Sequence, residues 1–444
     1  MSWQDWLAAL SLANLVYLRL WTELLTTNAP AMYWLKTPPI PAHYIALMIN
    51  VILLSLVLLV GIGGLRKRSR LALRLMPVFG LAILVSLVNS LRTLIGRPGN
   101  SMFLRFVEQR APAIGVGITI LIVCALMFGG LRALRPVYHL LLLLSPFVVL
   151  SFGQAIGRMA AYDTSSTEDG PMAARLPAKP AGAPRVVWVI FDEWDQDLTF
   201  GERPARIAMP EVDRFRDGAF EAMDVQTANT MTDWSMPALI DGEPVHQVLS
   251  KGPSELMIQP ADSSQWVPWS RQDNVFRDAR QLGFNTAVVA WALPYCRVLK
   301  SDLSDCWWLA GSNQYNSNGD TLPQILLNQP RSLYENIYRS PFGQSLSTRR
   351  HAELYHTVMS KALEAVRDPG HGLTLLHLPA PHPPYFYNAR TERDDLNDTP
   401  GIGIFRQTQQ GYLDALALTD RSLGMLRRAM EQAGVWDSTT VIFS

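Results

Sequence analysis

Three short segments of the chain carry side chains that can bind a metal ion or act on an ester. Asp192 and Glu193 are adjacent acids, and two hard oxygen donors can hold a divalent cation such as Zn, Ca, Mg or Mn. Several hydroxyl side chains lie in residues 227–242, just before a stretch that can open a helix. His382 stands among prolines, which fix the backbone around its imidazole. These residue types suit metal-assisted attack on an anionic ester.

The hydroxyl segment offers three candidates, Thr230, Thr232 and Ser235, all ahead of Pro237. A hydroxyl at a helix N-terminus meets free backbone amides and the positive end of the helix dipole, which favours an anionic substrate. Helix capping is the simpler interpretation of such residues. Likewise, an isolated Asp-Glu pair can cap a turn, and a single His in a Pro-rich loop can be structural.

Alternating helices and strands are expected to position these segments. The run 185–191 (RVVWVIF) is continuously apolar and ends at the two acids, as a strand buried on both faces would. Further strands are predicted at 219–225, 284–291, 373–378 and 439–443, and helices at 209–218, 274–283, 351–367 and 405–432. This order predicts an α/β domain with a central, mostly parallel sheet, whose ligands gather at the carboxyl ends of the strands.

The first third of the chain is apolar enough to predict a membrane domain. About 20 apolar residues are needed to cross a bilayer as a helix, and spans are predicted at 8–26, 43–65, 76–95, 112–131 and 137–156. The first contains Arg19, so an interfacial helix is an alternative there. Arginines and a lysine in 66–74 and 132–135 place those loops in the cytoplasm. The catalytic segment then faces outside, on the periplasmic side of an inner membrane.

The composition sets the domain limits and excludes some classes of protein. Residues 1–157 form the predicted transmembrane bundle, 158–184 a linker rich in Ala, Pro, Gly and Ser, and 185–444 the α/β domain. The formal net charge is only +1, which gives no reason to expect nucleic acid as a partner. Cys296 and Cys306 can form a disulfide or remain buried thiols.

Taken in order, the motifs of residues 185–444 resemble the sulfatase branch of the alkaline phosphatase superfamily. VVWVIFDEWD is similar to the opening strand with its metal-binding acids, and MPEVDRFRDGAFEAMDV to the segment that follows. GFNTAVVAW is similar to a later Gly-Tyr-x-Thr strand, and HLPAPHPPYFY to a Pro-His-x-Pro loop whose His contacts the anionic group of the substrate. The resemblance implies a divalent metal and assigns His382 to the substrate.

The nucleophile segment departs from the formylglycine sulfatases. Ser235 is followed by Met, Pro, Ala and Leu, without the Arg of that motif. The segment is more similar to the membrane-bound lipid A phosphoethanolamine transferases, in which a Thr lies five residues before the Pro. That spacing selects Thr232 as the nucleophile and as a metal ligand beside Asp192 and Glu193.

The expected function is therefore metal-dependent hydrolysis of a sulfate or phosphate ester through a covalent enzyme ester on a membrane-embedded protein. One alternative is a transferase that moves a phosphoethanolamine or phosphoglycerol group from a membrane lipid to an envelope lipid or glycan. Another is a catalytically inactive envelope protein. In the family that the chain resembles, the strand at 439–443 leads into an Asp-His pair, so the sequence is also expected to be a C-terminally truncated fragment.

Overall fold

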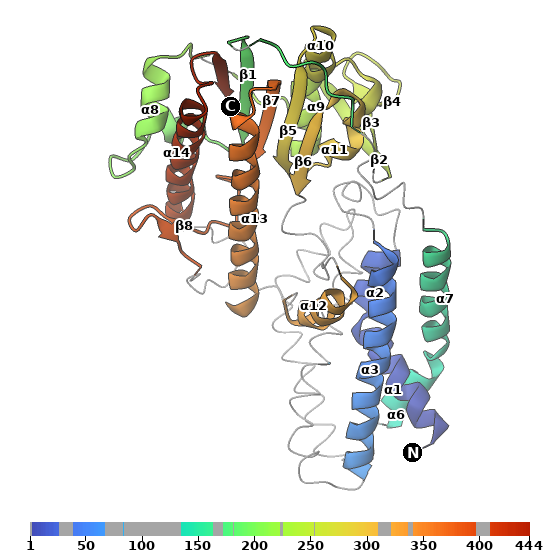
Figure 1. Cartoon of the computed structure of the whole chain (residues 1–444). Helices are drawn as coiled ribbons and strands as arrows, with labels where there is room; N and C mark the ends of the chain where they lie inside the picture. Colours follow the sequence, from blue (N-terminus) through green and yellow to red (C-terminus); the bar gives the residue numbers. More distant parts are fainter. Residues whose placement is uncertain are drawn as a thin grey trace. The chain divides into compact units, whose positions relative to one another are not determined.

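The computed structural model of the protein describes residues 2–25, 39–66, 83, 135–162, 172–180, 182–222, 225–252, 254–309, 321–335, 341–396 and 409–444. The chain forms two compact units (Figure 1). The first contains residues 1–26, 39–162 and 315–337, and the second contains 27–38, 163–314 and 338–444.

The first unit is helical. Its described helices are α1 (Trp3–Val16), α2 (Leu18–Leu25), α3 (Pro41–Arg66), α6 (Arg135–Leu143), α7 (Pro146–Ala160) and α12 (Leu322–Glu335). Two stretches, Pro41–Gly61 and Arg135–Ala160, are long and apolar enough to cross a membrane, and they coincide with the predicted spans 43–65 and 137–156. The predicted span 8–26 is divided at Tyr17 into α1 and α2, neither of which is long enough by itself. The predicted spans 76–95 and 112–131 lie outside the described residues.

Helix α12 packs against α3, although its sequence lies far along the chain, within the predicted α/β domain. The contact is polar: Asn50 donates to the side-chain oxygen of Gln329 at 2.9 Å, and Gln329 donates to the carbonyl oxygen of His43 at 2.9 Å. All three residues are buried. Because the buried side-chain amides of Asn50 and Gln329 are paired, α12 packs in the first unit without the cost of burying them unpaired.

A five-stranded sheet forms the centre of the second unit. Its strands are β1 (Arg185–Phe191), β5 (Asn285–Trp291), β6 (Asp305–Leu309), β7 (His371–Leu378) and β10 (Thr439–Phe443). The order is β10-β1-β7-β5-β6, and every pairing is parallel. The predicted parallel sheet is therefore present, and its strands at 185–191, 284–291, 373–378 and 439–443 are those that the apolar runs predicted.

Helices cover both faces of this sheet, as Figure 1 shows for α13 and α14 on one side. Alternate residues of β1 point to opposite faces: Val187 and Val189 pack against α8 (Pro210–Asp217), α13 (Pro341–Arg367) and α14 (Gln409–Gln432). Ile190 instead joins the core formed with α9 (Thr232–Asp241), α10 (Val275–Gln281) and α11 (Tyr295–Val298). Burial on both faces explains why these strands have no polar alternation.

Smaller elements complete the second unit. An antiparallel sheet consists of β2 (Val245–Gly252), β3 (Glu255–Pro260) and β4 (Val267–Pro268), and a hairpin pairs β8 (Tyr387–Asn388) with β9 (Arg393–Asp394). One π-helical turn, η3 (Asp197–Gly201), follows β1, and single turns of 3-10 helix occur at η4 (Trp269–Arg271) and η5 (Lys300–Asp302).

The predicted strand at 219–225 is wrong. Its described residues form no strand, and Phe220 and Val225 are 95% and 67% exposed. A β-type sequence without a neighbouring strand to pair with has no ladder to join.

Residues 158–160 of the predicted linker belong to α7, and its described residues 172–180 and 182–184 are held against the second unit. The amide of Ala173 donates to the carbonyl oxygen of Leu303 at 2.9 Å, and that of Leu176 to the side chain of Asn285 at 2.7 Å. This segment is therefore ordered by hydrogen bonds that its composition did not predict.

Candidate active site

The predicted acids and His382 meet at the carboxyl edge of the sheet, together with His377, which was not among the predicted site residues. Asp192 and Glu193 directly follow β1, His377 is the penultimate residue of β7, and His382 lies in the loop after β7. The Nε2 atom of His377 is 3.5 Å from Oδ2 of Asp192, and Nε2 of His382 is 3.5 Å from Oε1 of Glu193. Because β1 and β7 are parallel neighbours, their ends are brought together as the sequence predicted.

The two carboxylates have different surroundings. The side chain of Asp192 is only 12% exposed, whereas that of Glu193 is 52% exposed. Burial alone would raise the pKa of Asp192, but the hydrogen bond and positive charge of His377 hold that pKa below its usual value. Burial raises the pKa of Glu193; His382 opposes this effect, and the charge of Asp192 adds to it. Asp192 is therefore an ionised, nearly buried acid, and Glu193 is the more accessible of the pair.

Trp291, the last residue of β5, contacts the ring of each site histidine. Its ring centroid is 4.8 Å from that of His382 and 6.2 Å from that of His377. The hydroxyl of Tyr295 lies 3.0 Å from Nδ1 of His377, so both nitrogens of this imidazole face a polar partner. The aromatic side chains thus fix the orientation of the imidazoles.

A further histidine, His351 of α13, supports the loop that carries His382. Its Nε2 atom is 3.1 Å from the carbonyl oxygen of His382. Burial lowers the pKa of His351 to about 4, and the charge of His382 acts in the same direction. At neutral pH His351 is therefore uncharged, and a carbonyl partner requires its Nε2 to carry the proton and donate.

Thr232 is the first residue of α9. The helix thus begins five residues before Pro237 and includes that proline. The Ser235 hydroxyl donates to the carbonyl oxygen of Asn229 at 2.7 Å, whereas Thr232 takes part in none of the side-chain hydrogen bonds that the structure gives for the described residues. None of these contacts connects Thr232 with Asp192 or Glu193, and the ligand trio of Thr232 with the two acids stays a prediction.

The residues present fit a divalent cation in part. Two adjacent carboxylates, one of them ionised and nearly buried, are the oxygen donors that such ions prefer. Among the described residues, however, no three His, Cys, Asp or Glu side chains come together as ligands. Asp192 and Glu193 would thus be two ligands of such an ion, and a complete coordination sphere needs others.

Sequence reasoning assigned no role to the residues that support this site. Trp291 ends the GFNTAVVAW segment that carries part of the resemblance, whereas Tyr295 and His351 belong to helices without a recognisable motif. A buried tryptophan at the carboxyl end of a core strand is a signal that could have indicated Trp291. The disulfide between Cys296 and Cys306, which the sequence left as one of two possibilities, is formed.

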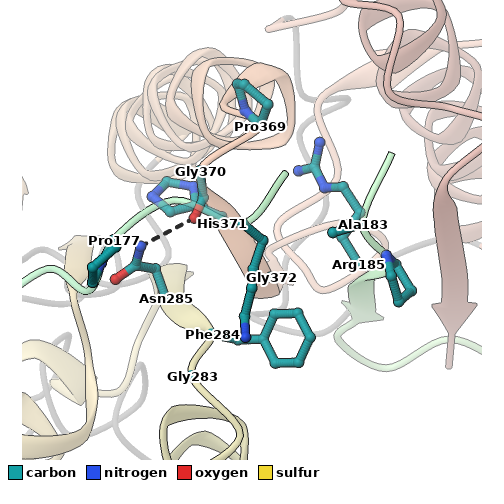
Figure 2. Close-up of a pocket in the computed structure, with 12 residues that line it drawn as sticks. Pro177, Ala183, Arg185, Gly283, Phe284, Asn285, Pro369, Gly370, His371 and Gly372 are labelled. Atoms are coloured by element: carbon teal, nitrogen blue, oxygen red, sulfur yellow. Dashed lines mark hydrogen bonds between the residues drawn. The ribbon is translucent and has the colours of Figure 1, made fainter. Parts of the chain in front are cut away.

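A pocket lies elsewhere, at the opposite edge of the same sheet (Figure 2). Its lining includes Arg185, Asn285 and His371, which are the first residues of β1, β5 and β7. Arg185 and Lys179 donate to carbonyl oxygens at the C-terminal ends of α13 and α10, where cations stabilise the helix dipole. The helix ends thus explain why these two positive charges lie here. The pocket is separate from the cluster of acids with His377 and His382.

The fold and this cluster define an α/β protein with a polar site at the carboxyl edge of a parallel sheet. The sulfatase family model matches residues 184–444, which is more than half of the chain and includes every residue of the cluster. The protein therefore belongs to the sulfatase family, within the alkaline phosphatase superfamily.

Other comparisons add little to this assignment. No curated protein matches the chain. Among solved structures, that of Ps i-CgsB is similar at 16% identity with a TM-score of 0.39, covering 59% of this chain and 58% of that one. The same protein in complex with k-i-k-neocarrahexaose gives a TM-score of 0.38 at the same identity and coverage. The chain thus spans 58% of the length of the solved structures that it matches.

Proposed function

We propose that this protein is a membrane-anchored, metal-dependent enzyme that hydrolyses sulfate or phosphate esters through a covalent enzyme ester. The observation that carries the proposal is the meeting of Asp192 and Glu193 with His377 and His382 at the carboxyl edge of a sulfatase-family sheet. Carboxylates and imidazoles at this edge can hold a cation and transfer a proton, which are the two needs of ester cleavage.

In the proposed reaction, the Thr232 hydroxyl oxygen forms a bond to sulfur or phosphorus while the bond to the leaving alcohol breaks. The location of Thr232 at the start of α9 supports this role, because the helix N-terminus favours an anion. His382 binds the ester oxygens or gives a proton to the leaving oxygen. Water then attacks the enzyme ester and releases Thr232. A divalent cation held by Asp192, Glu193 and Thr232 would lower the pKa of the Thr232 hydroxyl and would attract the anionic ester.

The membrane location is part of the proposal. The two apolar helical stretches, Pro41–Gly61 and Arg135–Ala160, support an integral membrane protein by length and composition. The basic residues of the short loops favour a catalytic unit outside the cytoplasm. Membrane lipid and an anionic ester are then the expected partners.

The test uses the purified full-length protein in detergent micelles. Metal content is measured by mass spectrometry of the elements, and hydrolysis by nitrophenyl sulfate and nitrophenyl phosphate. Thr232→Ala is expected to lose activity by at least about 100-fold while retaining its fold, because no nucleophile remains. Thr230→Ala and Ser235→Ala serve as matched controls from the same segment. Full activity in Thr232→Ala would reject Thr232, and loss in only one of the controls would assign the attack to that residue.

A transferase is the second candidate. The apolar helices favour it, because they would hold the catalytic unit beside lipid donors and acceptors. An acceptor hydroxyl then replaces water in the second step. Labelled phospholipid distinguishes the two reactions: label in a second lipid or glycan indicates transfer, and label in water indicates hydrolysis. A folded wild-type protein that binds no stoichiometric metal would contradict both and indicate an inactive envelope protein.

A further inference from the structure

We infer that Tyr412 of α14 is a positioning residue that holds Glu193 in the conformation in which its carboxylate stands beside His382. The inference rests on the proposed role of Glu193 as a metal ligand. It is carried by the backbone conformation of Glu193, by the hydrogen bond from Tyr412 and by the packing that fixes Tyr412.

Glu193 occupies a turn position that favours glycine. The turn runs from Phe191 to Trp194 and is closed by a hydrogen bond of 3.3 Å from the Trp194 amide to the Phe191 carbonyl oxygen. Glu193 is its third residue and has a φ of +64°. A side chain other than Gly or Asn is disfavoured in this left-handed region, so the surrounding structure must hold Glu193 there.

Tyr412 provides that hold. Its hydroxyl donates to the carbonyl oxygen of Glu193 at 2.7 Å. The phenol of α14 thus anchors the backbone of the segment that carries the acids. A hydrogen bond to this carbonyl oxygen opposes rotation of the peptide that follows Glu193.

Tyr412 is itself fixed by the loop of His382. Its ring meets the ring of Tyr385 at a centroid distance of 5.9 Å in an edge-to-face arrangement. The preceding residue, Gly411, lies so close that an added Cβ would be 2.7 Å from Cδ2 of Tyr385. Tyr385 is three residues after His382. The Tyr385–Tyr412 pair therefore ties the histidine loop to the turn of Glu193.

Removal of the phenol hydroxyl is expected to free this turn. In Tyr412→Phe the ring can still pack on Tyr385, but the carbonyl oxygen of Glu193 loses its donor. The turn then samples conformations with negative φ, which turn the Glu193 side chain away from His382. Loss of a supporting hydrogen bond of this kind lowers metal affinity by about 10- to 100-fold.

The experiment compares full-length Tyr412→Phe with Tyr355→Phe. Tyr355 of α13 is a matched control, because its hydroxyl also makes a hydrogen bond, 2.7 Å to Ser422, away from the acids. Hydrogen exchange is measured on chelated, metal-free protein, followed by the affinity for Mn²⁺ and the kcat and KM for nitrophenyl sulfate. The peptide with residues 191–195 should exchange about tenfold faster in Tyr412→Phe alone. Mn²⁺ affinity should fall about tenfold or more, and kcat should fall more than KM changes.

Each outcome decides one claim. Unchanged exchange at residues 191–195 in Tyr412→Phe overturns the inference, whether or not the wild type is active. Faster exchange with unchanged Mn²⁺ affinity also overturns it, because Tyr412 would then only stabilise the turn. Equal effects in Tyr355→Phe would show a general loss of stability and reject the assignment. A wild type that binds no Mn²⁺ defeats the proposed function and, with it, the positioning role, whereas the exchange result still identifies what holds the turn.

Discussion

Replacing Asp241 by Asn should stabilise the second unit relative to the wild type, and this stabilisation should be larger at pH 8 than at pH 5. Asp241 is the last residue of α9, where the negative end of the helix dipole disfavours a carboxylate. One of its oxygens accepts a hydrogen bond of 3.0 Å from the indole nitrogen of Trp269. The other is buried and has no hydrogen-bond partner among the described residues. Burial accordingly raises the pKa of Asp241 to about 7.

The direction of the effect follows from proton binding. The pKa of Asp241 is raised in the folded protein above the ordinary value of 3.8 that applies in the unfolded chain. Its contribution to stability is therefore fully present below pH 4 and is lost as the pH rises to about 7. At about 1.4 kcal/mol for each pH unit, the loss amounts to about 4 kcal/mol as an upper limit. Between pH 5 and pH 8 at most about 2.7 kcal/mol of this is lost, and because Asp241 is not fully buried we expect about 1–3 kcal/mol.

Asn is a suitable replacement because its amide oxygen still accepts from Trp269 while the side chain cannot ionise. The unpartnered second position costs a similar free energy at every pH, so it cancels from the pH dependence. The measured quantity is the difference in melting temperature between variant and wild type, followed by tryptophan fluorescence at pH 5 and pH 8. A change of about 1–3 kcal/mol corresponds to a shift on the order of 3–10 °C in this difference.

Asp262→Asn is the control, since Asp262 is exposed between β3 and β4. Its difference from the wild type should be the same at both pH values. If Asp241→Asn also gave parallel pH profiles, the carboxyl of Asp241 would be solvated in the folded protein, and the argument from its buried oxygen would be refuted.

Two further predictions concern other contacts in the second unit. Asp420 of α14 accepts hydrogen bonds of 2.9 and 2.8 Å from two amides at the start of α8, so Asp420→Ala should lower the free energy of unfolding by about 2 kcal/mol. Denaturation of the exposed Asp437→Ala provides the baseline, and equal losses in both variants would contradict the capping role. The Cys296–Cys306 disulfide should leave both thiols unlabelled by iodoacetamide in unfolded protein without reductant, and labelling there would show free thiols.

The sequence predicted the central strands because burial on both faces leaves an unmistakable apolar run. Strand β6 lacks this signal, since the side chains of Asp305–Leu309 are only partly buried at the edge of the sheet. The strand predicted at 219–225 shows the converse error: β-branched and aromatic residues such as Phe220 favour a strand only where a partner exists. Local composition therefore located the interior of the sheet and failed at its periphery.

The residues of the candidate site were likewise predicted only in part. The rule that parallel strands present ligands at their carboxyl ends correctly placed Asp192 and Glu193 near His382, and their chemical roles stay predictions. No local pattern could indicate His351 or Tyr412, because each acts through a contact between distant parts of the chain. The hydroxyl of Tyr412 meets a carbonyl oxygen 219 residues away in sequence. Such partners are set by packing of whole helices, which a single sequence does not reveal.

The two halves of the candidate site also depend on different cores. Helix α9, which begins at Thr232, packs through Met236 and Ile240 on one face of the sheet. Helices α13 and α14, which carry His351 and Tyr412, pack on the opposite face. Strands β1, β7 and β5 contribute buried residues to both cores, and Asp192 and Glu193 stand at the end of β1. The proposed nucleophile and the groups that orient the acids are therefore both positioned relative to β1, but from opposite faces of the sheet. A shift of α9 along its face would change the distance of Thr232 from the acids without disturbing the histidine loop.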